Sequence, residues 1–486
     1  MENKLSELAP QNVWKHFFAM CNIPHVSKHE EAISKYVIEF AEKNGIECHV
    51  DEVGNVLLRK PATEGMEGRK AIVLQGHLDM VAQKNGDKDF DFLTDPISPY
   101  IDGEWLTADG TTLGADNGIG VAASLAIMED DSLTHGPIEA LFTIDEETGM
   151  TGAFGLQPGF LQGEILLNLD SEDEGELYVG CAGGVDAMCY LPIKREAVGE
   201  GFTTFTIELK GLKGGHSGLE IILQRGNANK ALSRIIGECS KVCNLRVVSL
   251  QGGDVRNAIP RESAGVVAVE NSSIAAFESK ANEIVAAIIE ELKEREDSIT
   301  MSITKSDVTM SPLDQSSSKT LINLINVHPN GVIRMSDSLE GLVETSINLG
   351  VIKTQEDKIE CIALIRSSSD RAKDYLASQI ESLYELAGGK ASMDGSYSGW
   401  IPNMESSILQ TMKEGYKAMY GKTPEVKAIH AGLECGIIGG VYHDMDMISL
   451  GPTIRYPHSP DEKVNIQSVE KFYNFLTTTV SNAPLK

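Results

Sequence analysis

The feature that most constrains this fold is an apolar run that ends in side chains able to bind a metal ion. In residues 72–79 (IVLQGHLD), a continuous apolar stretch leads to His77 and Asp79. A continuous run, rather than an alternating one, is typical of a strand buried in a parallel sheet. Because residues two apart on a strand point the same way, both side chains should emerge at its carboxyl end, where open α/β sheets place their sites.

This stretch alone has a second explanation, a core histidine hydrogen-bonded to a neighbouring acid. The same ending recurs along the chain, however. Residues 140–144 (ALFTI) are followed by three acids, which include Glu146 and Glu147, and residues 165–170 (ILLNLD) close on Asp170. Three consecutive acids after an apolar strand are difficult to explain as a solvated surface. We therefore expect several strands to bring acids to one edge of a sheet.

Two further candidates lie outside the predicted strands. Asp116 stands just before a stretch of small and apolar residues that predicts a closely packed helix, so an ordinary N-cap is an alternative for it. His458 follows the predicted strand at 447–450 and lies between Pro457 and Pro460. Proline restricts its own backbone and that of the residue before it, and we expect a fixed, extended loop around His458.

The order of the expected elements predicts an α/β protein of more than one domain. With 486 residues the chain is too long for a single core. Residues 1–186 and 394–486 are expected to form a mixed, mainly parallel sheet flanked by helices, which carries the candidate residues. Residues 187–393 predict a second α/β domain. It is inserted into the first, because the strand that leads to His458 belongs with the strands before residue 186.

Composition and charge limit the partners of this chain. The net charge of −29 and the pI near 4.8 argue against nucleic acid and against an anionic membrane surface. No apolar run reaches the roughly 18 residues of a membrane helix, and the amino terminus shows no signal peptide. The eight cysteines include no Cys-x-x-Cys pair and are expected to be reduced. We expect a cytoplasmic protein.

A convergence of these strand ends would place five carboxylates in one cleft. Like charges that cluster there raise one another's pKa or destabilise the fold, and two divalent cations would remove the conflict. Imidazoles together with carboxylates suit Zn²⁺, with Co²⁺ or Mn²⁺ as substitutes. Two such metal ions held close together assist hydrolysis. One carboxylate must then bridge the ions, for which Asp116 is the best candidate. Either Glu146 or Glu147 should stay free as a general base for a metal-bound water.

Five motifs together resemble the di-zinc carboxypeptidase, aminoacylase and dipeptidase family. They are GHLD at 76–79, GADN at 114–117, DEETG at 145–149, LD at 169–170 and PH at 457–458. The resemblance implies one zinc on His77 and Asp170, another on Glu147 and His458, a bridging Asp116, Glu146 as catalytic base, and Asp79 as the partner of His77. It also implies a cis peptide bond between Asp116 and Asn117.

Further residues could hold the substrate, and for His216 the resemblance itself supports the role. His216, in a glycine-rich turn, would donate to the oxyanion, and a solvent-exposed turn histidine is the alternative. Arg256 with Asn257, and Arg366, could hold a dipeptide carboxylate, since a guanidinium matches that group. A surface ion pair is the alternative for each arginine. Glu434 could meet the free ammonium of the substrate or be structural.

Within the family, three stretches and the long insert resemble most closely the members that cleave unblocked dipeptides. They are DEETGMTGA at 145–153, KGGHSG at 213–218 and HAGLECG at 430–436. The expected activity is hydrolysis of Xaa-His dipeptides, β-Ala-His included, and of a broader range, with the insert as a lid that binds substrate. The family implies a homodimer, although a doubled insert could imitate the partner subunit in a monomer. The alternatives are an N-acyl amino acid amidohydrolase and a non-catalytic binding relative.

Overall fold

The computed structural model describes residues 4–486, which form two compact units. The first unit contains the chain up to Gly180, Trp400–Ala428 and Leu433–Lys486. The second unit contains Cys181–Gly399 and the short segment Ile429–Gly432.

The second unit extends beyond both of the borders that the sequence suggests. Residues 187 and 393 fall within β9 (Gly183–Pro192) and β19 (Lys390–Tyr397). These two strands pair with each other in one sheet, so neither of them can be divided between two cores.

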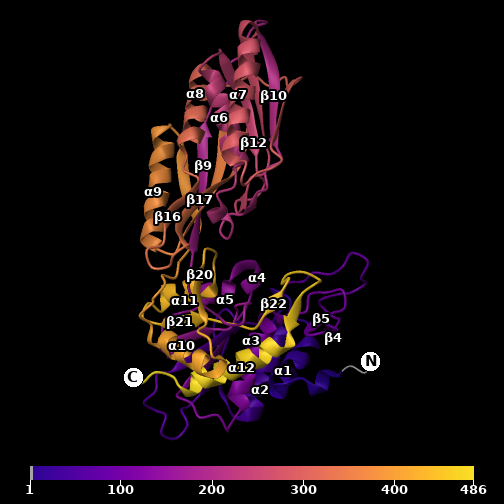
Figure 1. Cartoon of the computed structure of the whole chain (residues 1–486), viewed down its shortest axis with the longest axis vertical. Coiled ribbons are helices and arrows are strands. Elements are labelled where there is room, and N and C mark those ends of the chain that lie inside the picture. Colours follow the sequence, from indigo (N-terminus) through magenta and orange to yellow (C-terminus); the bar gives the residue numbers. More distant parts are fainter. Residues whose placement is uncertain (1–3) are drawn as a thin grey trace. The chain divides into compact units, whose positions relative to one another are not determined.

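An eight-stranded mixed sheet forms the centre of the first unit (Figure 1). Its four central strands β6, β3, β7 and β21 run parallel, and β1, β2 and β8 run antiparallel to their neighbours. Every residue of β3, β6 and β7 is buried, as their continuous apolar runs predict. The order is β1 (Glu47–Val50), β2 (Val56–Lys60), β6 (Ile138–Thr143), β3 (Ile72–His77), β7 (Ile165–Asn168), β21 (Asp446–Ser449), β8 (Glu176–Cys181) and β20 (Glu425–Ile429).

Helix α3 (Ala115–Glu129) is buried on nearly all sides, because it contacts β3 and β6 as well as α1 and α12. Its small and apolar residues permit this close packing. The other helices of the first unit are η1 (Lys4–Glu7), α1 (Gln11–Cys21), α2 (Glu31–Asn44), α4 (Glu146–Gly149), α5 (Thr151–Gly155), α10 (Ser407–Tyr420), α11 (Glu434–Val441) and α12 (Ile466–Ser481). No helix within residues 4–486 has both the length and the apolar character of a membrane span.

A small four-stranded sheet joins two distant parts of the first unit. It pairs β23 (Lys463–Asn465), which follows the His458 loop, with β5 (Trp105–Ala108), which precedes Asp116. Its outer strands are β22 (Ile454–Arg455) and β4 (Pro99–Asp102).

A nine-stranded sheet forms the second unit. Its neighbouring strands pair antiparallel, and β10 alternates between buried and less buried positions, because successive side chains of a strand point to opposite faces. The order is β15 (Thr300–Lys305), β10 (Phe202–Lys210), β14 (Ser263–Glu270), β12 (Leu245–Gly252), β17 (Val343–Thr354), β18 (Lys358–Ser367), β9 and β19, with β16 (Gly331–Met335) beside β17.

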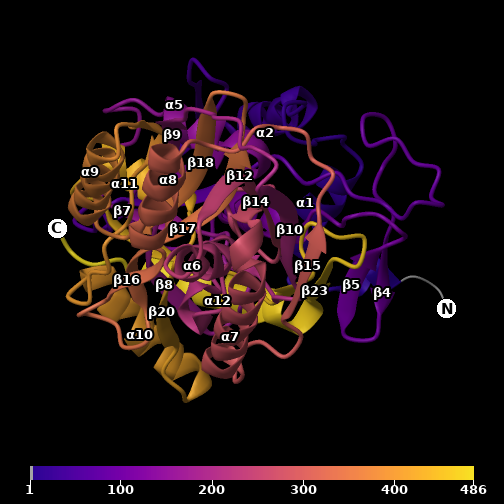
Figure 2. The ribbon, with the colours of Figure 1, turned by 90° about the horizontal axis from the view of Figure 1, so that it is seen from above.

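Four long helices cover an apolar core on this sheet. Helix α6 contacts both α7 and α8, and α9 lies against β9, β18 and β19. Figure 2 shows the four helices from above. The α/β class predicted from the sequence is confirmed. Their bounds are α6 (Ala228–Ser240), α7 (Ile274–Leu292), α8 (Gln315–Val327) and α9 (Asp370–Leu386); the short elements are β11 (Gly215–His216), β13 (Ala258–Ile259), η2 (Ile221–Leu223) and η3 (Asn271–Ser273).

Candidate metal centre

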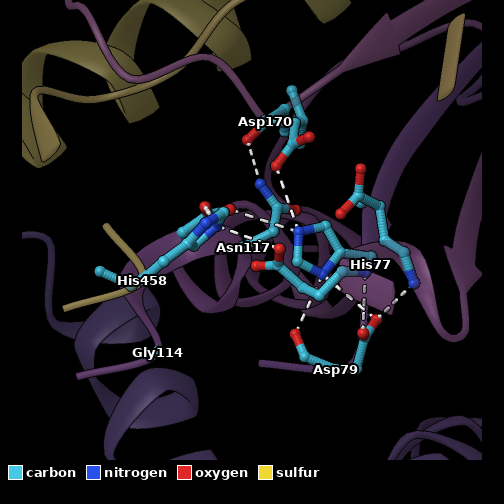
Figure 3. A network of polar contacts seen from close by, with 12 residues as sticks. His77, Asp79, Gly114, Asn117, Asp170 and His458 are labelled. Atoms are coloured by element: carbon cyan, nitrogen blue, oxygen red, sulfur yellow. Dashed lines mark hydrogen bonds and ion pairs between the residues drawn. The ribbon is translucent and has the colours of Figure 1, made fainter. Parts of the chain in front are cut away.

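The predicted metal-binding side chains of the first unit lie together (Figure 3). They come from the carboxyl end of β3, from the segments after β6 and β7, from the start of α3 and from the loop before β23. Three sets of potential ligand atoms lie within 4.8 Å of one another: His77 with Glu146 and Glu147, His77 with Asp116 and Asp170, and Asp116 with Glu147 and His458.

Asp116 is shared between two of these sets, and each of its carboxylate oxygens faces a different histidine. Its Oδ1 lies 3.2 Å from Nε2 of His77, and its Oδ2 lies 3.3 Å from Nε2 of His458. A second carboxylate faces each ring: Asp170 lies 3.3 Å from His77, and Glu147 lies 3.0 Å from His458. The arrangement is that of two neighbouring ligand groups with one common carboxylate.

The backbone around Asp116 is irregular and tightly packed. Gly114 adopts a left-handed conformation (φ 74°), Asp116 is not helical, and the peptide bond from Asp116 to Asn117 is cis, as the resemblance implies. The Asn117 amide donates to the carbonyl of Leu169 over 2.7 Å. A Cβ atom on Gly76 would lie 2.2 Å from Oδ1 of Asn117, so only glycine fits in β3 beside this helix start.

Asp79 connects His77 to the turn that carries Glu146 and Glu147. Nδ1 of His77 donates to the Asp79 carbonyl over 2.9 Å, which directs Nε2 towards the carboxylate cluster. The Asp79 carboxylate accepts the N–H groups of Glu146 (3.0 Å) and Glu147 (3.2 Å). It also accepts the hydroxyl of Ser27 over 2.8 Å, so Ser27 binds Asp79 and does not cap α2, which begins at Glu31.

The protonation equilibria of the cluster are strongly shifted. Burial lowers the pKa of His77, but Asp170, Asp116 and Asp79 outweigh it and hold that pKa well above its usual value. Hydrogen bonds to Asp116 and Glu147 raise the pKa of His458 to about 11. The carboxylates around each ring therefore favour its protonated form.

Burial also raises the pKa of the Glu146 carboxyl well above its usual range and that of Asp170 to about 6. One oxygen of Glu147 is buried and has no hydrogen-bond partner among residues 4–486. Raised carboxyl pKa values and a buried oxygen without a partner both indicate an excess of negative charge, which favours the binding of cations. The donor set therefore fits two divalent cations of the zinc type.

The loop around His458 differs from its predicted form. His458 (φ 57°) and Tyr456 (φ 56°) both adopt left-handed conformations, so the prediction of an extended loop is wrong. The physical reason is that Pro457 and Pro460 restrict themselves and the residues before them, and His458 belongs to neither group. A turn closes instead, in which the Glu462 N–H donates to the Ser459 carbonyl over 3.0 Å.

Sequence reasoning missed two carboxylates near the cluster, Glu172 and Glu462. Burial, with Asp116 and Asp170 nearby, raises the pKa of Glu172 to about 8. Glu462 is buried and accepts backbone N–H groups next to Asp116. Glu172 follows an apolar strand and could have been found by that pattern. Glu462 could not, because its partners are backbone groups distant in sequence.

Glu434 is fully buried at the start of α11 in the first unit. Its Oε2 accepts from Gln75 (2.6 Å) and Thr143 (2.9 Å), while its Oε1 has no hydrogen-bond partner among the described residues. Burial, with the charge of Asp170, raises its pKa to about 7. A carboxylate with one free oxygen could accept a cationic group.

His216 and Arg366 converge within the second unit. A Cβ atom on Gly218 would lie 3.0 Å from Cε1 of His216 and 3.1 Å from Nε of Arg366. Nδ1 of His216 accepts the N–H groups of Gly218 (3.1 Å) and Leu219 (3.0 Å), so the proton of the neutral ring is on Nε2. Burial and the Arg366 charge lower the pKa of His216. The ring is therefore suited to donate a hydrogen bond from Nε2.

The two predicted carboxylate-binding arginines differ in their contacts. Arg366 is buried, donates to the Tyr397 hydroxyl over 3.2 Å, and has an Nε without a partner in the described chain. Arg256 is 54% exposed and forms an ion pair with Asp186. Asn257 precedes β13, and its carbonyl accepts the Ser217 N–H over 2.9 Å. Arg366 therefore retains donor capacity, whereas Arg256 is already paired.

Comparison with known proteins places these observations in a family. The profile described as peptidase family M20/M25/M40 matches residues 73–482. The chain is similar to the cytosol non-specific dipeptidase of Escherichia coli (strain K12), with 48% identity over 484 residues and full coverage of both chains.

Solved structures agree with this result. The aminoacylhistidine dipeptidase from Vibrio alginolyticus matches with 46% identity and a TM-score of 0.96, over 100% of this chain and 99% of that one. The aminopeptidase PepT from Bacillus cereus ATCC 10987 matches with 16% identity and a TM-score of 0.56, over 98% of each chain, and so shares the fold.

Proposed function

The chain belongs to peptidase family M20/M25/M40, and on this premise we propose that it is a metal-dependent dipeptidase that cleaves unblocked dipeptides. Xaa-His dipeptides, β-Ala-His among them, are the proposed substrates within a broader range. The observation that carries the proposal is the Asp116 carboxylate, whose two oxygens face His77 and His458 from two adjoining ligand groups.

We propose two Zn²⁺ ions as the resident metals, for which Co²⁺ or Mn²⁺ could substitute. His77 and Asp170 would hold one, Glu147 and His458 the other, and Asp116 would bridge them. Ions in these positions would polarise the scissile carbonyl and lower the pKa of a water molecule. The support is the chemistry of the donor set, two imidazoles and three carboxylates with ligand atoms within 4.8 Å in each group.

Glu146 is the proposed general base. Its carboxylate would take a proton from the attacking water and pass it to the leaving amine. A raised pKa supports this role, because a base that must later act as an acid works best with a pKa near the working pH. Asp79 would orient His77 through Nδ1 and hold the turn of Glu146 through its N–H group.

Five further side chains are proposed to bind the substrate. His216 would donate from Nε2 to the oxyanion, which its neutral ring and fixed tautomer support. Arg366 would bind the dipeptide carboxylate through its unpartnered Nε. Arg256 with Asn257 is the weaker candidate, because Arg256 forms an ion pair with Asp186. Glu434 would bind the free ammonium through its unpartnered Oε1, which would explain a preference for unblocked substrates.

Metal analysis and a substrate panel test the proposed function. The purified protein should contain two zinc ions, lose activity after chelation and recover it with Zn²⁺. Ala-His and β-Ala-His should be cleaved faster than N-acetyl amino acids. Faster turnover of the acetylated set would favour an amidohydrolase, and activity that survives exhaustive chelation would overturn the metal-dependent mechanism. A protein inactive on both sets would be a binding relative.

We also propose a cellular location, a class of partner and an oligomeric state for this protein. A cytoplasmic location is supported by the name of the Escherichia coli relative, a cytosol dipeptidase. The net charge of −29 supports small peptides rather than nucleic acid or membrane as partners. A homodimer is proposed on family grounds, and light scattering of the full chain would distinguish it from a monomer.

A further inference from the structure

Glu462 connects the two loops that carry Asp116 and His458. The side chain is 2% exposed. Its carboxylate accepts the N–H groups of four consecutive residues, Leu113 at 2.7 Å, Gly114 at 2.9 Å, Ala115 at 2.8 Å and Asp116 at 3.2 Å. These bonds span more than 340 positions of sequence and end on the backbone of the shared carboxylate.

The arrangement requires an anion with two acceptor oxygens. Oε2 accepts from Leu113 and Gly114, and Oε1 accepts from Ala115 and Asp116. A glutamine would retain one acceptor oxygen and would direct its NH₂ group at two N–H donors. Burial of a carboxylate without compensating donors is unfavourable. The four N–H groups compensate the buried charge and so hold the Glu462 carboxylate in place.

Glu462 is itself anchored on both sides. The Thr107 hydroxyl donates to its carbonyl over 2.8 Å, and its N–H donates to the Ser459 carbonyl over 3.0 Å. The loop that it closes contains the left-handed residues Tyr456 and His458. Left-handed backbone is unfavourable for residues other than glycine and persists only where surrounding contacts impose it. The bonds of Glu462 supply such contacts.

We propose that Glu462 is a positioning residue that sets the separation of Asp116 and His458 and so preforms the ligand group of Asp116, Glu147 and His458. The inference rests on the proposed metal-dependent function and adds a residue to it. Ligand positions that are fixed before an ion binds make binding tighter. Loss of the Glu462 bonds should therefore weaken most the ion at Glu147 and His458, because Asp116 and His458 lose their fixed spacing. The ion at His77 and Asp170 should be affected less, because strand ends hold those ligands.

Zinc titration of metal-free full-length Glu462→Gln against a chromophoric chelator tests this directly. The affinity of one ion should fall about 10- to 100-fold, and it should be the ion that His458→Ala also weakens. The affinity of the other ion should change less than about threefold. Dipeptidase kcat should fall in parallel while KM stays within about twofold, since the proposed substrate contacts remain.

Glu139→Gln is the matched control. Glu139 is also buried in the first unit and accepts two backbone N–H groups, from Gln162 and Gly163, and an Arg59 bond, each over 2.8 Å. It lies near the start of β6, away from the cluster. This variant should lower Tm without any change in zinc affinity. If it weakened the same ion as Glu462→Gln, the effect would be one of general stability and the inference would be overturned.

Thr107→Val is a second variant for the case that Glu462→Gln does not fold. It removes one hydroxyl from a buried position and should weaken the same ion by a few-fold. If folded Glu462→Gln or Thr107→Val bound both ions with wild-type affinity, the positioning role would be refuted. The proposed function would not be affected by that result. A wild-type protein that binds fewer than two ions would refute the proposed function, and the positioning role with it.

Discussion

The pKa values of histidines in the two units are shifted in opposite directions. In the first unit, carboxylates raise the pKa values of His77 and His458 and so favour the protonated form of both rings. In the second unit, burial with the charge of Arg366 lowers the pKa of His216 and brings that of His430 to about 3. Histidine therefore favours its protonated form at the first two positions and its neutral, hydrogen-bonding form at the other two.

The cause of the difference is the partner of each ring. His77 and His458 face carboxylate oxygens at 3.0–3.4 Å, whereas the His430 ring meets the Ser346 hydroxyl at 2.7 Å. A cation can enter only where negative charge exceeds what the protein itself neutralises. The contrast supports the proposed metal chemistry in the first unit and neutral hydrogen bonding in the second.

The largest expected effect tests whether the first unit performs the chemistry. Glu146→Gln should lower kcat by about 10²- to 10⁴-fold, because a glutamine cannot accept the proton of the attacking water. Zinc content should remain at two ions. The measurement is steady-state hydrolysis of Ala-His together with metal analysis of the same sample. Undiminished kcat would assign the base elsewhere.

The next effect tests the neutral donor of the second unit. His216→Ala should reduce kcat by about 10²-fold, the usual loss for an oxyanion donor, with zinc content unchanged. His443→Ala, which alters an exposed histidine of the first unit, is the control and should have wild-type kinetics. A His216→Ala variant that lost zinc but kept kcat per bound metal would contradict the contrast between the units.

A third prediction concerns acid stability of the second unit. Burial lowers the pKa of His328 from 6.5 to about 4, so the folded state resists protonation that the unfolded chain accepts. The stability contributed by this group is complete above pH 6.5 and is lost as the pH falls to about 4. The loss is on the order of 2–3 kcal/mol.

Urea unfolding at pH 7 and pH 4.5 should show this loss in the wild type. His328→Asn, whose amide can replace the Nδ1 bond to the Pro329 carbonyl, should have a flatter pH dependence. An identical slope in both proteins would show that His328 does not carry the effect.

The smallest effect distinguishes the two arginines of the second unit. Arg366→Lys should raise KM for dipeptides about tenfold, because a lysine cannot offer the guanidinium fork to a carboxylate. Arg256→Lys should change KM less, since Arg256 is paired with Asp186. The test is KM for free dipeptides against their C-terminal amides. If Arg256→Lys raised KM as much as Arg366→Lys does, Arg256 would also bind the substrate carboxylate.

Local patterns predicted much of the fold and the cluster. The strand ends at His77 and Asp170 follow from continuous apolar runs and from the rule that parallel strands deliver their sites at one edge. The left-handed conformation of His458 and the hydrogen bonds of Glu462 could not be predicted from the sequence. They depend on contacts with backbone groups that are distant in the sequence and leave no local pattern. The pairing of Arg256 with Asp186 is equally non-local.

The segment Ile429–Gly432 has a consequence for how this molecule could be taken apart or rebuilt. It belongs to the second unit although both of its neighbours in the chain belong to the first, and its His430 ring meets Ser346. The insert is therefore no self-contained cassette: excision of residues 181–399 would leave His430 behind without its partner. A recombinant fragment of the insert would need those four residues grafted back, and a transplant into another scaffold would have to carry two pieces.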